Sequence, residues 1–337
     1  MEGNMTAEER PPIGVLLMAY GTPNSPEEIE PYYTDVRGGR PPTPELLAQL
    51  QDRYRQVGGR TPLLEISRAQ AKRLEERLNA DEPGRYIKVY LGMKHWHPYI
   101  EEAVRQMEAD GIREAVALAL APHYSKLSIG GYVERIEQAQ SKLAAEHVAN
   151  ASQGANTPIH FTYVKSWHDE PLFWQALEHQ VRAARMAKFP DEPANAVFVI
   201  FTAHSLPQRI QQENDPYQRE LLATSAGVAG LLGLRRDRWD FAFQSAGRTP
   251  EPWLGPDILE KVRELAARGE NCILICPVGF ISDHLEILYD IDIECRDLAK
   301  ELGIHLERIE MLNASASLIA ALASVVERYT PALTSDV

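Results

Sequence analysis

Short runs of apolar and β-branched residues recur along the chain, each followed by a stretch in which apolar residues are spaced three or four apart. The first pattern is typical of buried parallel strands and the second of amphipathic helices, so their alternation predicts βα units. Eight strands are expected, at residues 13–20, 86–92, 115–121, 160–164, 196–203, 239–244, 272–278 and 305–309. The predicted fold class is α/β, with parallel sheets flanked by helices.

Several of the predicted helices carry start signals. Residues 25–28 read Ser-Pro-Glu-Glu, a capping box with proline at the first helical position. The pairs Thr43-Pro44 and Asp215-Pro216 repeat the proline device, and the helix that begins at Thr43-Pro44 is expected to end at Gly58-Gly59.

The stretch 187–195 is the best candidate for a linker, because it is polar and contains two prolines and two acids. It separates four predicted strands from the next four. Two similar Rossmann-like domains are therefore expected, at 11–188 and 195–308, each with a parallel four-stranded sheet. Residues 309–337 are expected to form a C-terminal segment that packs back on the N-terminal domain.

Polar residues follow the predicted strands at their carboxyl ends, where open parallel sheets bind ligands. These ends from both domains can meet only if the domains face each other, so the active site is expected in an interdomain cleft. The residues concerned are Tyr20, Gly21, Lys94, His95, Pro122, His123, Tyr124, His204, Gln244, Ser245 and the segment 277–283.

Carboxylates recur at positions 286, 290 and 294, among leucines and isoleucines. On a helix this spacing stacks three acids on one face, where they repel one another and lose hydration. Such a stripe is expected where cations or protons use it. Asp283-x-x-Glu286 is also a capping-box pattern, which would explain Glu286 but leaves Asp290 and Glu294 unexplained.

An apolar strand leads directly into His204. An imidazole at that sheet edge could be a metal ligand, a base or a buried structural histidine, and an acid facing it would favour the first two. The pair His95-Trp96-His97 is weaker evidence for a metal, because this spacing on a loop fits positioning or helix capping better. A Walker loop, a GxSxG elbow, an HExxH motif and paired CxxC motifs are absent from the sequence, which removes the commonest hydrolase, zinc-protease and redox classes.

The chain has 337 residues, of which 44% are hydrophobic and 25% charged, with a formal net charge of -13. No apolar run approaches the ~18 residues of a membrane span and the N-terminus lacks an apolar signal core, so a soluble cytoplasmic protein is expected. The negative charge disfavours nucleic acid. Residues 31–60 are a local exception, with five arginines against three acids and with three tyrosines. That stretch suits a flat anionic ligand, although an ordinary solvated helix face would look similar.

Three cysteines, at positions 272, 276 and 295, are an odd number without disulfide spacing. They are expected to be reduced thiols. Three cannot supply the four thiolates of an ordinary iron–sulfur cluster, so no such cluster is expected.

One run of residues resembles the signature of the ferrochelatases: Phe201-Thr202-Ala203-His204-Ser205-Leu206-Pro207, followed by Asn214-Asp215-Pro216-Tyr217. Further segments fall in the order of that family, at 18–23, 92–95, 121–125, 244–247, 252–257 and 277–280, followed by the acidic helix. The resemblance covers essentially residues 11–330. It implies insertion of ferrous iron into a porphyrin in haem biosynthesis.

Within that family the chain looks most like the soluble enzyme of Gram-positive bacteria, which converts coproporphyrin III to Fe-coproporphyrin III (coproheme). The lack of a targeting peptide, the lack of a four-cysteine segment and the presence of Tyr20 support this subtype. A protoporphyrin IX ferrochelatase, a cobalt-type tetrapyrrole chelatase and a non-catalytic tetrapyrrole carrier stay open, with a nucleotide-binding α/β protein as the generic alternative.

Carried over by position, the resemblance implies that His204 and Glu286 are the catalytic pair and bind the incoming ferrous ion, with His204 neutral and Glu286 ionised. Tyr20 would be the axial ligand of the porphyrin iron. Tyr289, Asp290 and Glu294 would relay protons or metal. The residues implied to contact the porphyrin are Tyr20, Arg37, Arg53, Tyr54, Thr61, Tyr132, Lys94 and His95. Thr61 stands where the family would have serine and keeps the hydroxyl.

The resemblance also implies the partners. Ferrous iron is a substrate, and no cofactor is expected to be bound permanently. The expected partners are coproporphyrin III or a related porphyrin and, transiently, a downstream coproheme decarboxylase. A monomer without nucleic-acid partners or a transmembrane segment is expected.

Overall fold

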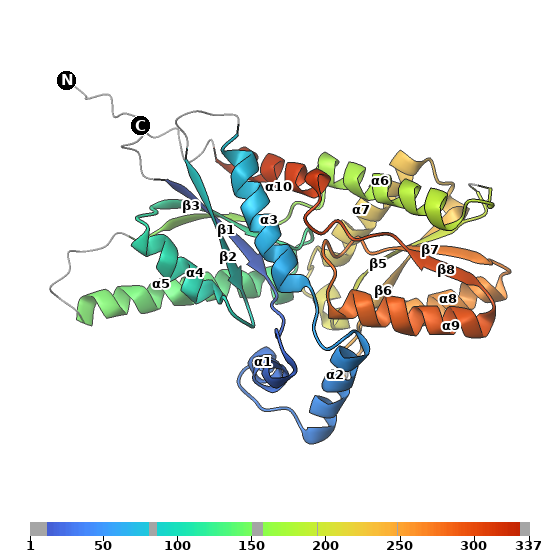
Figure 1. Ribbon diagram of the computed structural model, residues 1–337, viewed down its shortest axis with the longest axis horizontal. Coiled ribbons are helices and arrows are strands. Elements are labelled where there is room, and N and C mark those ends of the chain that lie inside the picture. The colour runs from blue at the N-terminus through green and yellow to red at the C-terminus, as the bar shows by residue number, and fades with distance from the viewer. Residues whose placement is uncertain (1–11, 81–85, 150–157, 194, 248, 331–337) are drawn as a thin grey trace.

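The computed structural model describes residues 12–80, 86–149, 158–193, 195–247 and 249–330. Within these ranges the chain forms two four-stranded sheets that lie side by side along the long axis of the molecule (Figure 1). Every strand pair in both sheets is parallel. The predicted fold class is confirmed, and each predicted strand is found within a few residues of its expected bounds.

The first sheet has the order β2-β1-β3-β4. Its strands are β1 (Ile13–Ala19), β2 (Ile87–Met93), β3 (Glu114–Ala119) and β4 (His160–Val164).

The two faces of this sheet are covered by different helices because successive side chains of a strand point to opposite sides. Val15 and Leu17 of β1 pack in one core cluster with α3 (Leu63–Leu78). Leu16 and Met18 pack in another with α4 (Ile100–Ala109) and α5 (Gly131–Ala149). No helix within the described ranges has both the length and the apolar character that a membrane span requires.

The second sheet repeats this plan with the order β6-β5-β7-β8. Its strands are β5 (Phe198–His204), β6 (Trp239–Gln244), β7 (Cys272–Cys276) and β8 (His305–Arg308). One face is covered by α6 (Pro171–Lys188) and α7 (Tyr217–Leu232), and the other by α8 (Ile258–Ala267) and α9 (Arg296–Leu302).

Three helices lie outside this plan. The last helix, α10 (Ala316–Tyr329), returns from the second sheet to pack against α3 and α6. The helices α1 (Ile29–Val36) and α2 (Pro44–Gln56) pack on each other and project away from both sheets (Figure 1).

The expected capping box at residues 25–28 is wrong. The Ser25 side chain makes no cap hydrogen bond, and residues 26–28 form a short 3-10 turn before α1. The Glu28 carboxylate instead accepts the backbone N–H of Asn24 at 2.8 Å and the indole N–H of Trp96 at 2.7 Å. It therefore ties the chain to the loop after β2. The other two start signals hold, since Thr43 and Asp215 each accept a backbone N–H of the helix that follows.

The loop after β7 runs directly over the end of β5. The Gly279 N–H donates to the Thr202 carbonyl at 3.1 Å. A Cβ atom at position 279 would lie 2.8 Å from the Cα of Ala203, which is too close for any side chain. Glycine at this position therefore lets the loop pass beside His204.

Replacement of Gly279 by alanine is expected to lower the free energy of unfolding by about 2 kcal/mol, because the added methyl group must displace backbone in a packed interior. The control is Gly230→Ala in α7, where a Cβ would meet nothing within 4 Å. There alanine should raise stability by roughly 0.5 kcal/mol, because it loses less backbone entropy on folding. Chemical denaturation measures both, and equal effects of the two variants would contradict the close approach.

Candidate active site

A cavity of about 450 Å³ opens where the carboxyl ends of the strands of both sheets meet. The first sheet contributes Tyr20, Lys94 and His123 to its lining, and the second contributes His204 and the segment 279–282. The prediction of a cleft formed by strand ends from both halves is confirmed. Its size is in the range of sites for small organic ligands and cofactors.

His204 and Glu286 form an ion pair at the wall of this cavity. The Nε2 atom of His204, the last residue of β5, lies 3.2 Å from Oε1 of Glu286. The other ring nitrogen, Nδ1, donates to the carbonyl of Ser205, so Nε2 is the atom that faces the acid. The Tyr217 hydroxyl donates to the His204 carbonyl at 3.0 Å and helps to fix the strand end. The acid that would favour a chemical role for His204 is thus present.

Each partner of this pair favours the charged form of the other. Burial by itself lowers the pKa of His204, but the Glu286 carboxylate outweighs it and raises the pKa to about 9. Burial likewise opposes ionisation of Glu286, but His204 and His284 hold its pKa well below the usual range. The expectation of an ionised Glu286 is met. The carboxylate also stabilises the imidazolium of His204, so the neutral His204 expected for metal binding stays a prediction.

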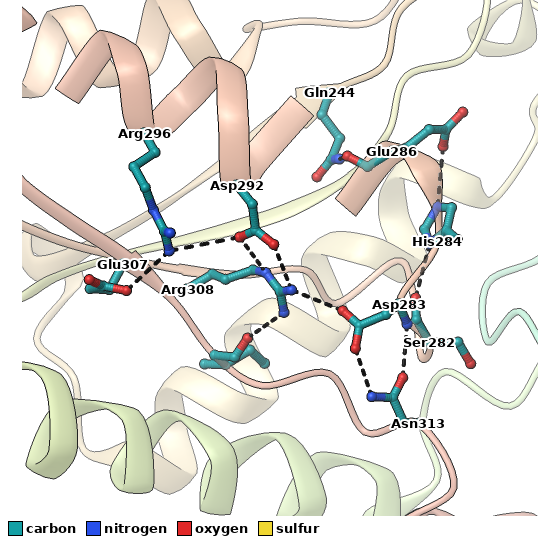
Figure 2. A network of polar contacts seen from close by, with 11 residues as sticks. Gln244, Ser282, Asp283, His284, Glu286, Asp292, Arg296, Glu307, Arg308 and Asn313 are labelled. Atoms are coloured by element: carbon teal, nitrogen blue, oxygen red, sulfur yellow. Dashed lines mark hydrogen bonds and ion pairs between the residues drawn. The ribbon is translucent and has the colours of Figure 1, made fainter. Parts of the chain in front are cut away.

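A second imidazole, which the sequence did not single out, lies on the other side of Glu286. His284 Nε2 is 3.5 Å from Glu286 Oε2, and its Nδ1 donates to the Ser282 carbonyl at 2.9 Å (Figure 2). The only available signal was its position two residues before Glu286. Within the described part of the chain, no three His, Cys, Asp or Glu side chains form a ready-made metal site. The paired His204 and Glu286 at the cavity wall, with His284 nearby, offer nitrogen and oxygen donors and are the candidates for binding a divalent metal ion.

The capping-box interpretation of Glu286 is also wrong. Its side chain makes no cap hydrogen bond, and the helix that follows is a π-helix, η6 (Ile287–Cys295). The carboxylate that was expected to cap, Asp283, binds Arg308 and Asn313 instead. Wide π-turns of this kind are rare and are frequent at functional sites.

The acids of the stripe differ in their surroundings. Asp290 is buried, accepts the Ser245 hydroxyl, and has its Oδ1 3.6 Å from a guanidinium nitrogen of Arg53. Glu294 is half-buried. Ser245 has a left-handed backbone with φ of 61°, which is uncommon for a residue other than glycine and is held here by the surrounding contacts.

Burial and then the Glu286 carboxylate raise the pKa of Asp290 to about 7, although the Ser245 hydroxyl and Arg53 oppose the shift. Asp290 can therefore exchange a proton near neutral pH.

Five of the eight residues expected to contact the porphyrin line the cavity: Tyr20, Arg53, Tyr54, Lys94 and Tyr132. The Lys94 ammonium lies 5.5 Å from the ring of Tyr132. The Arg53 guanidinium lies 4.7 Å from the ring of Tyr289, a member of the predicted relay.

Two of the remaining three residues lie beside the cavity. Thr61 is buried behind the wall, where its hydroxyl is 2.9 Å from that of Thr22, and Thr22 in turn is 3.3 Å from the Tyr54 hydroxyl. Arg37 is half-buried at the end of α1, with its guanidinium 5.7 Å from the ring of Tyr33, which lines the cavity.

His95 supports Tyr20 from behind. Its ring centroid is 4.6 Å from that of Tyr20, and its Nδ1 lies 2.7 Å from Asp35. His97 is exposed and pairs with Glu102 at the start of α4. The two histidines therefore face different partners, as expected for positioning and capping roles.

The fold is that of tetrapyrrole chelatases. The crystal structure of the sirohydrochlorin chelatase SirB from Bacillus subtilis subspecies spizizenii in complex with cobalt aligns with a TM-score of 0.51 at 11% identity. The alignment covers 96% of this chain and 98% of that one. At this identity the likeness concerns the fold alone.

The family follows from the sequence comparison. The ferrochelatase family model matches residues 12–330. A ferrochelatase from Herpetosiphon aurantiacus is 47% identical over 93% of this chain and 97% of its own length. A coproporphyrin III ferrochelatase from Geobacillus kaustophilus is 45% identical over 93% of this chain and 94% of its own length. The chain belongs to the ferrochelatase family, whose members are enzymes that insert metal into a porphyrin.

The buried Asp290 makes stability depend on pH. The native state holds this proton with a pKa of about 7, whereas an unfolded aspartate has a value of 3.8, so the free energy of unfolding falls as pH rises through this window. Asp290→Asn removes the cost of ionisation. The free energy of unfolding of this variant relative to wild type should therefore rise by roughly 1 to 3 kcal/mol when the pH is raised from about 5 to about 8.

Denaturation at the two pH values measures this gain. The control is Glu301→Gln, because Glu301 is an exposed acid on α9, the helix that directly follows η6. An Asp290→Asn gain that does not change with pH would contradict the raised pKa.

Proposed function

We propose that this protein inserts ferrous iron into coproporphyrin III to give coproheme, a step of haem biosynthesis. The observation that carries the proposal is the His204–Glu286 pair, 3.2 Å apart at the wall of a cavity that also presents Tyr20, Arg53 and Lys94. The relative from Geobacillus kaustophilus, which is named a coproporphyrin III ferrochelatase, supports the choice of porphyrin.

His204 and Glu286 are proposed to receive the iron and to accept the two protons that leave the pyrrole nitrogens. The imidazolium of His204 must first release its Nε2 proton to water in the cavity, because only the neutral nitrogen has a lone pair for iron. Glu286 is ionised and lies in position to take up a proton or to bind iron itself. His284 holds the other oxygen of the carboxylate and leaves Oε1 directed at His204.

The relay is proposed to run outward along η6, through Asp290 to Glu294, with Tyr289 beside it. Asp290, with its pKa of about 7, gains and loses a proton near neutrality. Glu294 is half-buried, so it lies closer to water than Asp290. Arg53 contacts both Asp290 and Tyr289 and therefore joins the relay to the cavity wall.

The porphyrin is proposed to lie against the aromatic side of the cavity. Tyr20, which is 46% exposed, would bind the iron of the product as an axial ligand, with His95 fixing its ring. Tyr54 and Tyr132 would contact the macrocycle and Thr61 would hold Tyr54 through Thr22.

Cations around the cavity favour an acidic porphyrin. Arg53 and Lys94 line it and Arg37 lies beside its edge. Coproporphyrin III carries four propionates and protoporphyrin IX two, so a mouth with several cations gains more from the first.

Further proposals concern the setting of the reaction. Iron is a substrate, and an iron–sulfur cluster is not expected because the chain has three cysteines. All three are buried free thiols, which fits a reducing cytoplasm. A monomer suffices, since one chain supplies both walls of the cavity. The coproheme product would pass to a decarboxylase by transient contact.

Anaerobic steady-state assays of iron insertion with coproporphyrin III and protoporphyrin IX, side by side, test the choice of porphyrin. A higher kcat/KM with coproporphyrin III is expected, because its additional propionates meet the cations of the cavity. Faster use of protoporphyrin IX would overturn the substrate and leave the family intact. The same assay is repeated with cobalt in place of iron. Faster insertion of cobalt than of iron would favour the cobalt-type alternative.

Loss of either partner of the central pair should stop turnover. His204→Ala and Glu286→Gln are each expected to lower kcat by about 100-fold or more, because each removes a metal donor and a proton acceptor. Glu294→Gln should only slow the reaction, because it removes an outer relay step.

Porphyrin binding, measured by fluorescence quenching, should persist in all three variants. Glu301→Gln is the control and should keep the wild-type rate. A carrier without catalysis needs neither His204 nor Glu286, so full activity of His204→Ala would contradict the mechanism.

A further inference from the structure

Glu286 and His284 lie at the end of a loop, and a loop alone does not hold side chains to within a fraction of an ångström. The segment between β7 and η6 has no regular structure before residue 285. Yet the Glu286 carboxylate lies 3.2 Å from the imidazole of His204, which is at the end of β5. The chemistry of the pair therefore depends on what fixes this loop.

Asn313 holds the loop at three points. Its side-chain oxygen accepts the backbone N–H of Asp283 at 2.8 Å, and its side-chain nitrogen donates to the Asp283 carboxylate at 2.7 Å. Its own backbone N–H donates to the Ile281 carbonyl at 2.7 Å. Figure 2 shows the two side-chain bonds closing a ring between the residues. This ring, which we call the Asn313 clamp, fixes both the backbone and the side chain of Asp283.

The backbone of Asn313 is itself in a special conformation. Its φ is 48°, in the left-handed region that asparagine tolerates better than most residues. This conformation is found beside β8, 30 residues away from Asp283 in the chain. The contacts with the loop help to retain it.

Arg308 extends the clamp to the π-helix. Its guanidinium binds both oxygens of Asp292 at 2.8 Å and also donates to Asp283 at 2.9 Å (Figure 2). The loop before Glu286 and the helix after it are thus bound to one half-buried cation. Charge-assisted bonds of this kind are stronger than neutral ones and fix orientation.

Gln70 links the clamp to the N-terminal half of the chain. From α3 its amide nitrogen donates to the Asn313 carbonyl at 2.7 Å and to the Ser282 hydroxyl at 3.0 Å. The same helix contributes Leu63 and Ser67 to the cavity wall. Gln70, Arg308 and Asn313 are not themselves among the lining residues.

We propose that Asn313 is a positioning residue for metal insertion, which acts through the clamp on Asp283 to hold Glu286 and His284 against His204. This inference rests on the proposed function. It assigns Asn313 no contact with porphyrin or iron, so its loss should affect the chemical step and the use of iron and leave porphyrin binding unchanged.

The decisive variant is Asn313→Asp, which places a carboxylate against that of Asp283 and breaks the clamp. The expected result is a fall of about tenfold or more in kcat or in the apparent affinity for iron, as for other partners that orient metal ligands. The dissociation constant for porphyrin, measured by fluorescence, should stay within about twofold of wild type, because Asn313 is outside the cavity.

The second variant is the exchange Asp283→Asn with Asn313→Asp. Here the amide of residue 283 can donate to the new carboxylate, which can also accept the backbone N–H of residue 283. The clamp re-forms with its groups exchanged, so most of the lost rate should return. Asn313→Gly completes the set, since glycine accepts the left-handed backbone without strain but has no side chain to bind Asp283. Asn313→Gly should therefore lower the rate of iron insertion without placing a second carboxylate next to Asp283.

Asn214→Asp is the matched control, because Asn214 is also left-handed, with φ of 55°, and is exposed. It should keep the wild-type rate. Failure of the wild-type protein to insert iron would overturn the proposed function itself. With an active wild type, full rate and unchanged iron KM in both Asn313→Asp and Asn313→Gly would overturn the positioning role. The positioning role would also be overturned if the double variant Asp283→Asn with Asn313→Asp unfolded at the wild-type temperature but did not recover the lost rate.

Discussion

The structure depends on one carboxylate held between two imidazoles. Glu286 lies 3.2 Å from His204 on one sheet and 3.5 Å from His284 on its own loop, at a wall of the cavity. A carboxylate in such a place is costly unless it is paired, and here one partner, His204, is a group that can also release a proton. The same pairing that stabilises Glu286 therefore makes the site responsive to a metal ion, which can replace the proton of His204.

The position of that carboxylate explains features that are distant from it. Gly279 lets the loop pass beside β5, where the Gln244 side chain donates to the Glu286 carbonyl at 3.3 Å. Arg308 binds the loop to the π-helix through Asp283 and Asp292. These contacts come from three strands and one helix of the second half of the chain. The acids in and before η6 are stabilised in different ways: Glu286 pairs with His204 and His284, Asp290 has a raised pKa and accepts the Ser245 hydroxyl, and Asp292 pairs with Arg308.

Much of this could be predicted from sequence because it follows from patterns with a fixed period. The eight strands were found from apolar runs, and the strand-end rule placed Tyr20, Lys94 and His204 around one cavity. What failed was local hydrogen bonding. Capping boxes were expected at residues 25–28 and 283–286, and neither forms. The Ser25 side chain makes no cap hydrogen bond, and the Asp283 carboxylate binds Arg308 and Asn313 instead.

The contact of His284 with Glu286 was missed as well. It depends on which side chain a loop brings to within a few ångströms, and sequence spacing does not encode that distance. The π-helix shows the same limit, because an i, i+4 stripe of acids fits an α-helix and a π-helix nearly equally well.

Arg53 shows how the two halves of the site are coupled. It comes from α2, in the arm that projects from the sheets, and lines the cavity from there. It lies 3.6 Å from Asp290 and stacks on Tyr289, both on the π-helix of the other half. Because this guanidinium lowers the pKa of Asp290, an anionic group that draws it away must strengthen the hold of Asp290 on its proton. The charge state of the acids beyond Glu286 is therefore tied to what occupies the cavity, through a single cation shared between them.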